Sequence, residues 1–103
     1  MKKIIKGKKY DTETATKLGS WFNGYSYSDF NYLNENLYLK KTGEYFLHGE
    51  GGALSKYARY NAANGVYEGG SVIKPLSKEE AMEWAEDKLD VDKYEEIFGE
   101  VEE

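Results

Sequence analysis

The chain's single histidine, His48, stands two residues before Glu50 in the sequence His-Gly-Glu-Gly-Gly at 48–52. A histidine and a carboxylate beside flexible backbone can act as acid and base, but the chemistry needs a nucleophile or a metal ligand within hydrogen-bond reach. With one histidine and no cysteine, the chain offers few such partners. A histidine at a strand end before a glycine turn is more often structural or solvent-facing. We therefore expect no enzyme, and a small nuclease or hydrolase built on His48 and Glu50 is the last of three hypotheses.

The glycines around this histidine do not form a known ligand-binding motif. They lack the Gly-Lys-Ser/Thr ending of a phosphate-binding loop and the spacing of a dinucleotide loop, and no acidic stretch has the spacing of a calcium loop. We expect no cofactor and no dedicated metal site. The simpler interpretation of glycines 49, 51, 52, 69 and 70 is that they take positive φ angles or allow close approach of backbone.

A second set of residues suited to chemistry is a row of carboxylates. Glu79, Glu83, Glu86 and Asp90 have the spacing i, i+4, i+7 and i+11, which on a helix spans about 16 Å. Like charges four residues apart repel, and acids near a helix C-terminus oppose the helix dipole, so stability alone does not favour this pattern. Two interpretations stay open: a solvated face that keeps a small protein soluble, or a surface that imitates a row of phosphates and binds a basic groove.

Tyrosines are the third candidate group. The chain has ten tyrosines against four phenylalanines, and Tyr25, Tyr27, Tyr32 and Tyr38 lie in or near expected strands. An aromatic platform for stacked bases normally comes with a basic groove, which this charge balance does not supply. Tyrosines that close a small core are the favoured interpretation, with the remainder at a protein interface. The candidate partner-binding residues are therefore Glu79, Glu80, Glu83, Glu86, Asp87, Asp90, Tyr25 and Tyr27.

A helix over 77–90 must position the carboxylates. Ser77 and Glu80 have the spacing of a capping box, and Pro75 lies just outside the helix. Ala81, Trp84, Ala85 and Leu89 share one side, nearly opposite the acidic row. Asp90 or Asp92 caps a short last helix whose apolar side is Tyr94, Ile97 and Phe98 and whose stop is Gly99. An acidic tail at 100–103 is expected to fray.

The earlier part of the chain predicts mainly strands. A strand or hairpin turning at Gly7 is expected over 2–10, followed by two helical turns over 12–18 that Asp11 caps. A tight hairpin is expected next, with Asn23-Gly24 as the turn between Trp21-Phe22 and Tyr25-Ser-Tyr27. Strands at 35–41 and 44–48, joined at Thr42-Gly43, should form the centre of the sheet, and the glycines at 49–52 should end the second of them. The remaining expectations are a short helix or strand at 53–60, a loop at 61–70 and an edge strand at 71–74 that runs into Pro75.

These elements predict one α+β domain over 1–103, in which a small antiparallel sheet of hairpins packs against the C-terminal amphipathic helix and the short last helix. The chain has no apolar run of the length that spans a membrane and no signal-peptide pattern, so a cytoplasmic protein without a membrane partner is expected. Six lysines face two acids in residues 1–17, charges balance over 18–76, and three lysines face twelve acids over 77–103. Because the C-terminal third is so acidic, it repels phosphates. Direct nucleic-acid binding is therefore disfavoured unless the basic N-terminal arm acts alone.

Three segments resemble a family of small acidic proteins carried by phages and integrative elements of Gram-positive bacteria. They are Lys-Lys-Ile-Ile-Lys-Gly-Lys-Lys-Tyr-Asp-Thr-Glu-Thr-Ala at 2–15, Leu-Tyr-Leu-Lys-Lys-Thr-Gly-Glu-Tyr-Phe-Leu-His-Gly-Glu-Gly-Gly at 37–52, and Pro-Leu-Ser-Lys-Glu-Glu-Ala-Met-Glu-Trp-Ala at 75–85. Some proteins of this kind are anti-CRISPRs, which bind an effector nuclease and block DNA recognition or cleavage. The resemblance covers most of the chain, but it brings no motif of catalytic residues.

The leading hypothesis is thus a non-enzymatic inhibitor from a mobile element, an anti-CRISPR that binds a host defence nuclease through the acidic helix. Such nucleases hold nucleic acid in positively charged channels, which suit a compact acidic ligand. The runner-up is an interaction adaptor or subunit that uses a tyrosine-rich sheet face.

Overall fold

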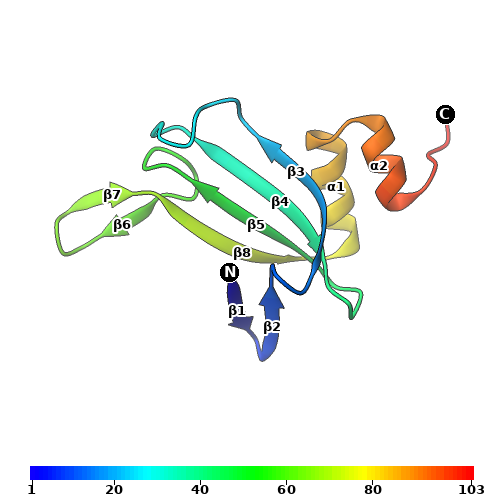
Figure 1. Cartoon of the computed structure of the whole chain (residues 1–103), viewed down its shortest axis with the longest axis horizontal. Helices are drawn as coiled ribbons and strands as arrows, with labels where there is room; N and C mark the ends of the chain where they lie inside the picture. Colours follow the sequence, from blue (N-terminus) through cyan, green and yellow to red (C-terminus); the bar gives the residue numbers. More distant parts are fainter.

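A four-stranded antiparallel sheet forms the middle layer of the protein (Figure 1). The computed structural model describes residues 1–103. The sheet has the order β3-β4-β5-β8, with bounds Thr16–Phe22, Leu33–Leu39, Tyr45–Gly51 and Gly70–Leu76. The hairpin of β1 (Lys2–Ile5) and β2 (Lys8–Asp11) covers part of one face, and the helices α1 (Lys78–Lys88) and α2 (Val91–Phe98) lie on the other side. A small hairpin of β6 (Arg59–Asn61) and β7 (Val66–Glu68) projects from the end of the sheet. The expected α+β fold is confirmed.

Alternation along the two central strands divides the core into two clusters. Leu37 and Leu47, which pair across β4 and β5, point to the helices and pack against Ala81 of α1. Their neighbours Tyr38 and Phe46 point the other way and stack with ring planes 8° apart. Successive side chains of a strand point to opposite faces, so a sheet covered on both sides carries two thin cores.

The hairpin side is closed by aromatic residues. Tyr10 of β2 meets Phe46 edge-on with 5.5 Å between ring centroids, and Ile73 of β8 completes the cluster. The β1–β2 turn is built at Lys6 and Gly7, whose φ angles are 51° and 80°. Two consecutive positive φ angles match the twist of a hairpin, and the hairpin expected at Gly7 is confirmed.

The helical turns expected over 12–18 are wrong. Asp11 does cap a single turn, because its side chain accepts a hydrogen bond from the Glu13 amide at 2.9 Å and its carbonyl accepts one from the Ala15 amide. After that turn the chain becomes strand β3, which pairs with β4. The β-branched threonines in this segment are weak helix formers, and pairing with a central strand outweighs the local cap.

The tight hairpin expected at Asn23-Gly24 is also wrong. The strand β3 ends at Phe22, the loop 23–32 follows, and β4 begins at Leu33, so Tyr25 and Tyr27 lie in a loop rather than a strand. The Asn23 side chain closes this loop by accepting hydrogen bonds from the amides of Leu33 and Tyr25 at 3.2 and 3.4 Å. An asparagine side chain that bonds nearby backbone can replace a two-residue turn with a wider loop.

Glycines 49–51 do not break the strand as expected, because β5 continues through Gly51. Residues 53–58 form turns without a helix, and the segment expected as a loop at 61–70 contains most of the β6–β7 hairpin. The hairpin joining β4 and β5 and the edge strand β8 with its Pro75 are confirmed.

Both C-terminal helices are confirmed with their caps. Ser77 and Glu80 form the complete capping box at the start of α1, Asp90 caps α2, and Gly99 ends it with φ of 95°. Residues 100–103 lie outside the regular elements. None of the helices is long and apolar enough to cross a membrane.

Candidate functional site

Glu79, Glu83 and Glu86 form an exposed row on α1, which we call the acidic ridge. On the opposite side of the helix, Ala81 and Ala85 are fully buried against the sheet, so the ridge points to solvent. None of its three carboxylates lies within ion-pair distance of a lysine or arginine of the chain. The ridge is therefore a row of charges without an internal partner.

The other three acidic candidates have partners within the chain: Glu80 and Asp87 lie on α1, and Asp90 lies between α1 and α2. Glu80 accepts the Ser77 amide at 2.9 Å, and this backbone hydrogen bond is the main reason that the pKa of Glu80 is lowered. Asp87 pairs with Lys88 at 3.3 Å, and Asp90 accepts the Lys93 amide at 2.8 Å as the cap of α2. The structure thus separates the six expected carboxylates into three free charges, two that cap helices, and Asp87, which pairs with its neighbour Lys88.

Glu35 of β4 is buried completely beneath α1. The sequence did not indicate this carboxylate as a candidate site residue. It accepts hydrogen bonds from the indole Nε1 of Trp84 at 3.0 Å, from Lys56 Nζ at 2.9 Å and from the Tyr57 hydroxyl. Burial raises the pKa of Glu35, but the hydrogen bonds from Tyr57, Lys56 and Trp84 outweigh it and hold that pKa below its ordinary value. A buried charge is tolerated when all its acceptor sites are paired, and Glu35 joins α1 and the loop 52–58 to the sheet.

A signal for Glu35 was present in the alternation of its strand. Leu37 and Leu39 were expected to share one face, and Glu35 lies two residues before Leu37 on that same face. The Tyr57 ring packs so close to Gly49 that a Cβ there would lie 2.2 Å from Tyr57 Cζ. Glycine at position 49 is therefore required by close approach.

The remaining glycines of this region also allow close packing. A Cβ on Gly51, Gly52, Gly69 or Gly70 would come within 2.2 to 2.9 Å of neighbouring atoms, most of them backbone. None of these glycines has a positive φ. Of the two expected roles, close approach is the one that applies, and it brings the loops 29–32 and 52–58 against the ends of β5 and β8.

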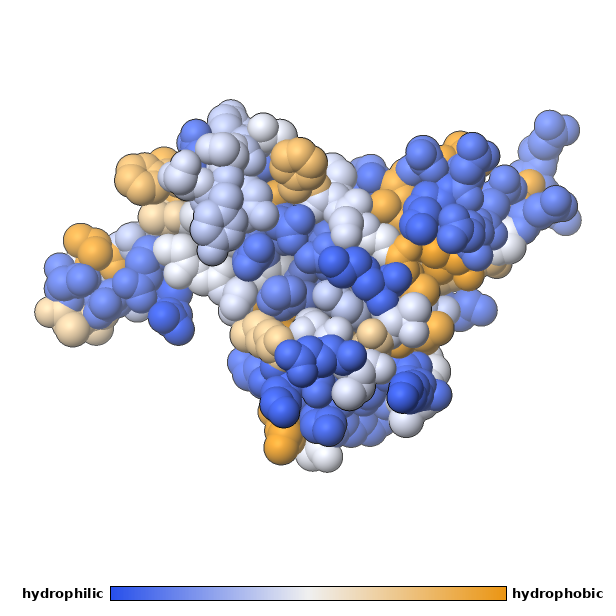
Figure 2. Space-filling model, viewed as in Figure 1, coloured by the Kyte–Doolittle hydropathy of each residue, from blue (hydrophilic) through white to orange (hydrophobic).

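The expected tyrosine candidates do not share one face of the sheet. Tyr38 is buried in the core, whereas Tyr25 and Tyr27 lie in the β3–β4 loop with exposed fractions of 49% and 78%. Tyr27 packs against Tyr32 with 5.3 Å between ring centroids. Figure 2 shows exposed hydrophobic residues at this end of the molecule, over the β3–β4 loop and the β6–β7 hairpin. The large exposed side chains here are Phe22, Tyr25, Tyr27, Phe30, Leu54, Tyr60 and Tyr67.

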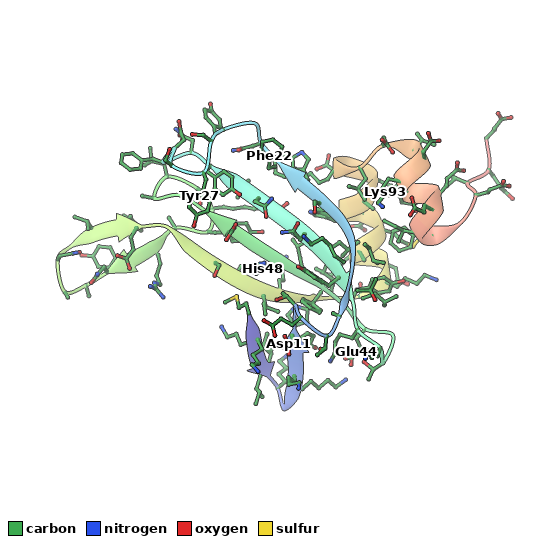
Figure 3. All side chains as sticks on the ribbon, in the orientation of Figure 1. Asp11, Phe22, Tyr27, Glu44, His48 and Lys93 are labelled. Atoms are coloured by element: carbon green, nitrogen blue, oxygen red, sulfur yellow. The ribbon has the colours of Figure 1, made fainter.

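His48 lies on β5, the strand that also carries Glu50 (Figure 3). Both residues share the hairpin face with Phe46, because they follow it at intervals of two along the strand. Burial lowers the pKa of His48; the charge of Glu50 acts in the opposite direction, and the N-terminus and Lys17 add to the lowering. His48 pairs across the sheet with Asn36, whose amide Nδ2 donates to Asn34 and whose Oδ1 accepts from the Ser20 hydroxyl at 2.6 Å. No group of three metal-ligating side chains surrounds it. The half-buried histidine therefore has a lowered pKa and sits in a polar patch.

Charges of opposite sign lie on opposite sides of the sheet. The β1–β2 hairpin carries Lys2, Lys3, Lys6, Lys8 and Lys9 on one side, and α1 carries the acidic ridge on the other. Glu44 in the β4–β5 turn holds the hairpin in place through ion pairs with Lys8 at 3.0 Å and with Lys40 at 3.1 Å. These two bonds lower the pKa of Glu44 to about 2.

Comparison of the chain with protein families, with curated proteins and with solved structures finds no match.

Proposed function

We propose that the protein is a non-enzymatic inhibitor that binds a basic protein surface through the acidic ridge of α1. Within this class, we propose an anti-CRISPR from a mobile element that acts on an RNA-guided effector nuclease in the host bacterial cytoplasm. The observation that supports it is that Glu79, Glu83 and Glu86 are exposed and lack cationic partners within the chain.

The physical basis is electrostatic. Free carboxylates on a rigid helix, held by a capping box and by Glu35 through Trp84, keep a fixed spacing. A fixed row of charges opposite a basic groove speeds association and sets the register of the complex. Channels that hold guide RNA and target DNA are lined with positive charge, so a ligand of this kind competes there with nucleic acid.

The test is a charge reversal with a matched control. The variant Glu79→Lys/Glu83→Lys/Glu86→Lys changes the ridge, and Glu100→Lys/Glu102→Lys/Glu103→Lys makes the same change of net charge in the C-terminal tail. Each purified protein is added to guide-loaded effector nucleases, and cleavage of target DNA and binding of target DNA are measured separately. Circular dichroism checks that both variants fold.

We expect the ridge variant to lose inhibition and the tail variant to keep most of it. Inhibition should also weaken as salt rises, because the interacting charges are exposed. If the ridge variant inhibits as strongly as the unchanged protein, the acidic ridge is not the binding site. Equal losses in both variants would mean that net charge, rather than the ridge, is responsible.

A second candidate is an interaction adaptor that binds through the end of the molecule formed by the β3–β4 loop and the β6–β7 hairpin, which we call the aromatic end. Its support is the set of exposed aromatic side chains, among them Tyr27, Phe30 and Tyr67 with exposed fractions of 78%, 67% and 63%. Contiguous exposed apolar residues are typical of protein interfaces. This candidate predicts binding that depends little on salt, is lost in Tyr25→Ser/Tyr27→Ser and survives reversal of the ridge.

A further inference from the structure

A cavity of about 510 Å³ opens at the aromatic end, between the β3–β4 loop, the end of β5 and the start of β8. Two tyrosine side chains, Tyr27 and Tyr32, and the carboxylate of Glu50 line it. Another part of its wall is the backbone of glycines 51, 52, 69 and 70, which have no side chains to fill it. In Figure 3, Tyr27 lies beside the end of β5, the strand that carries Glu50.

The two rings and the carboxylate form a group with negative character. Tyr27 and Tyr32 meet at 58° with 5.3 Å between centroids, and the Tyr27 ring is largely exposed. Glu50 is half-buried and has no ion pair within the chain. Tyr32 and Glu50 both line the cavity. Burial raises the pKa of the Tyr32 hydroxyl, and the charge of Glu50 and a hydrogen bond to it raise that pKa further.

The positive groups that line the cavity already have partners. Arg59 is paired with Glu68 at 3.3 Å, and the Met1 ammonium group donates to the Thr12 hydroxyl at 2.8 Å. Glu50 is thus the one charged side chain in the lining without an ion-pair partner. A half-buried carboxylate that has no cationic partner and lies beside two aromatic rings is complementary to a cation.

We propose that this cavity binds the side chain of an arginine from a protein partner, with the guanidinium against Tyr27 and Tyr32 and ion-paired to Glu50. A guanidinium is flat, stacks on aromatic rings and bonds a carboxylate with two N–H groups, so it fits this lining better than a lysine ammonium. A nucleotide fits poorly, because its phosphate would lie near the Glu50 carboxylate. The site lies apart from the acidic ridge and does not depend on the proposed inhibition.

The test uses N-acetyl-arginine amide as the probe and N-acetyl-citrulline amide as its neutral isostere. Each is titrated into the ¹⁵N-labelled protein, and amide shifts are followed by NMR. We expect the arginine probe to move the amides of glycines 51, 52, 69 and 70, with saturation, and the citrulline probe to leave them in place. The same shifts should persist in Glu79→Lys/Glu83→Lys/Glu86→Lys, which separates this site from the ridge.

Two variants and one control complete the test. Glu50→Gln keeps the shape of the side chain and should weaken arginine binding about tenfold or more, since a hydrogen bond to a charged group contributes about 1.5–3 kcal/mol and 1.4 kcal/mol is a factor of ten. Tyr27→Ala removes an exposed ring without touching the core and should also weaken binding, whereas Glu13→Gln, an exposed acid elsewhere, should not. Equal binding of citrulline, or unchanged affinity in both Glu50→Gln and Tyr27→Ala, would overturn the proposal.

Discussion

Replacing Glu35 with glutamine should destabilise the whole protein, although the side chain keeps its size. Glu35 is fully buried and accepts three hydrogen bonds, from Trp84, Lys56 and Tyr57. A glutamine has one acceptor oxygen and presents an N–H group to donors, so at least one of these bonds cannot form in its place.

The expected loss of stability follows from the hydrogen bonds that Glu35 accepts. A hydrogen bond to a charged group contributes about 1.5–3 kcal/mol. Lys56 is largely exposed and can turn to water, and the Tyr57 hydroxyl can accept from the new amide, which offsets part of the loss. A net loss of about 2–3 kcal/mol is expected, which for a domain of this size lowers the melting temperature by roughly 10–20 °C.

The assay is urea unfolding followed by tryptophan fluorescence at several pH values. The folded-state pKa of Glu35 is lowered. Its contribution to the free energy of unfolding is therefore complete above the unfolded-state pKa of about 4.3 and is lost as pH falls through the folded-state pKa. The difference between the unchanged protein and Glu35→Gln should therefore stay constant near neutral pH and shrink in acid. Tyr57→Phe, which removes one of the three donors, should lose less than Glu35→Gln.

Two results would refute this reasoning. One is a Glu35→Gln protein within about 0.5 kcal/mol of the unchanged protein at neutral pH, the size of an ordinary surface substitution. The other is a difference between the two proteins that does not shrink in acid. Either result would mean that Glu35 is not a charged anchor for the helix and the loop.

Two further predictions concern the packing of the loop and the hairpin. In Gly49→Ala, the new Cβ would lie 2.2 Å from Tyr57 Cζ, so the Tyr57 ring must move and its hydroxyl must leave Glu35. We expect the free energy of unfolding in urea to fall by about 3 kcal/mol. In a Tyr57→Ala background, Gly49→Ala should cause no added loss. In Glu44→Gln, the ion pairs with Lys8 and Lys40 are lost, and the resulting drop in the unfolding midpoint should be small. It should shrink at high salt because Lys8 is exposed, and it should vanish as pH falls from the unfolded pKa of Glu44 toward about 2.

The parts of the fold that were predictable have local signals. Ser77 and Glu80 define the start of α1 by their own side chains, and the alternation of leucines in β4 places that strand at the centre of the sheet. The segments that were mispredicted depend on distant partners. The threonine-rich stretch after Asp11 became a strand because β4 offers it a ladder, and Asn23 widened its turn because its side chain reaches Leu33.

The same distinction applies to the candidate site. Helical periodicity alone placed Glu79, Glu83 and Glu86 on one exposed face. Local spacing also indicated the caps in which Glu80 and Asp90 take part. It could not show that Glu50 lies beside two tyrosines from a loop some twenty residues away. Such contacts arise between segments that are remote in sequence, and no local pattern contains them.

The lysine hairpin and the acidic ridge lie on opposite sides of one sheet, so the molecule has a permanent electric dipole between them. In the field of a cationic groove, a torque acts on such a particle before any atoms touch. The helix side then turns toward the groove and the hairpin side turns away. Reversing the hairpin lysines would weaken this orientation even though those residues never enter the contact, while the added negative charge would strengthen the overall attraction to the groove.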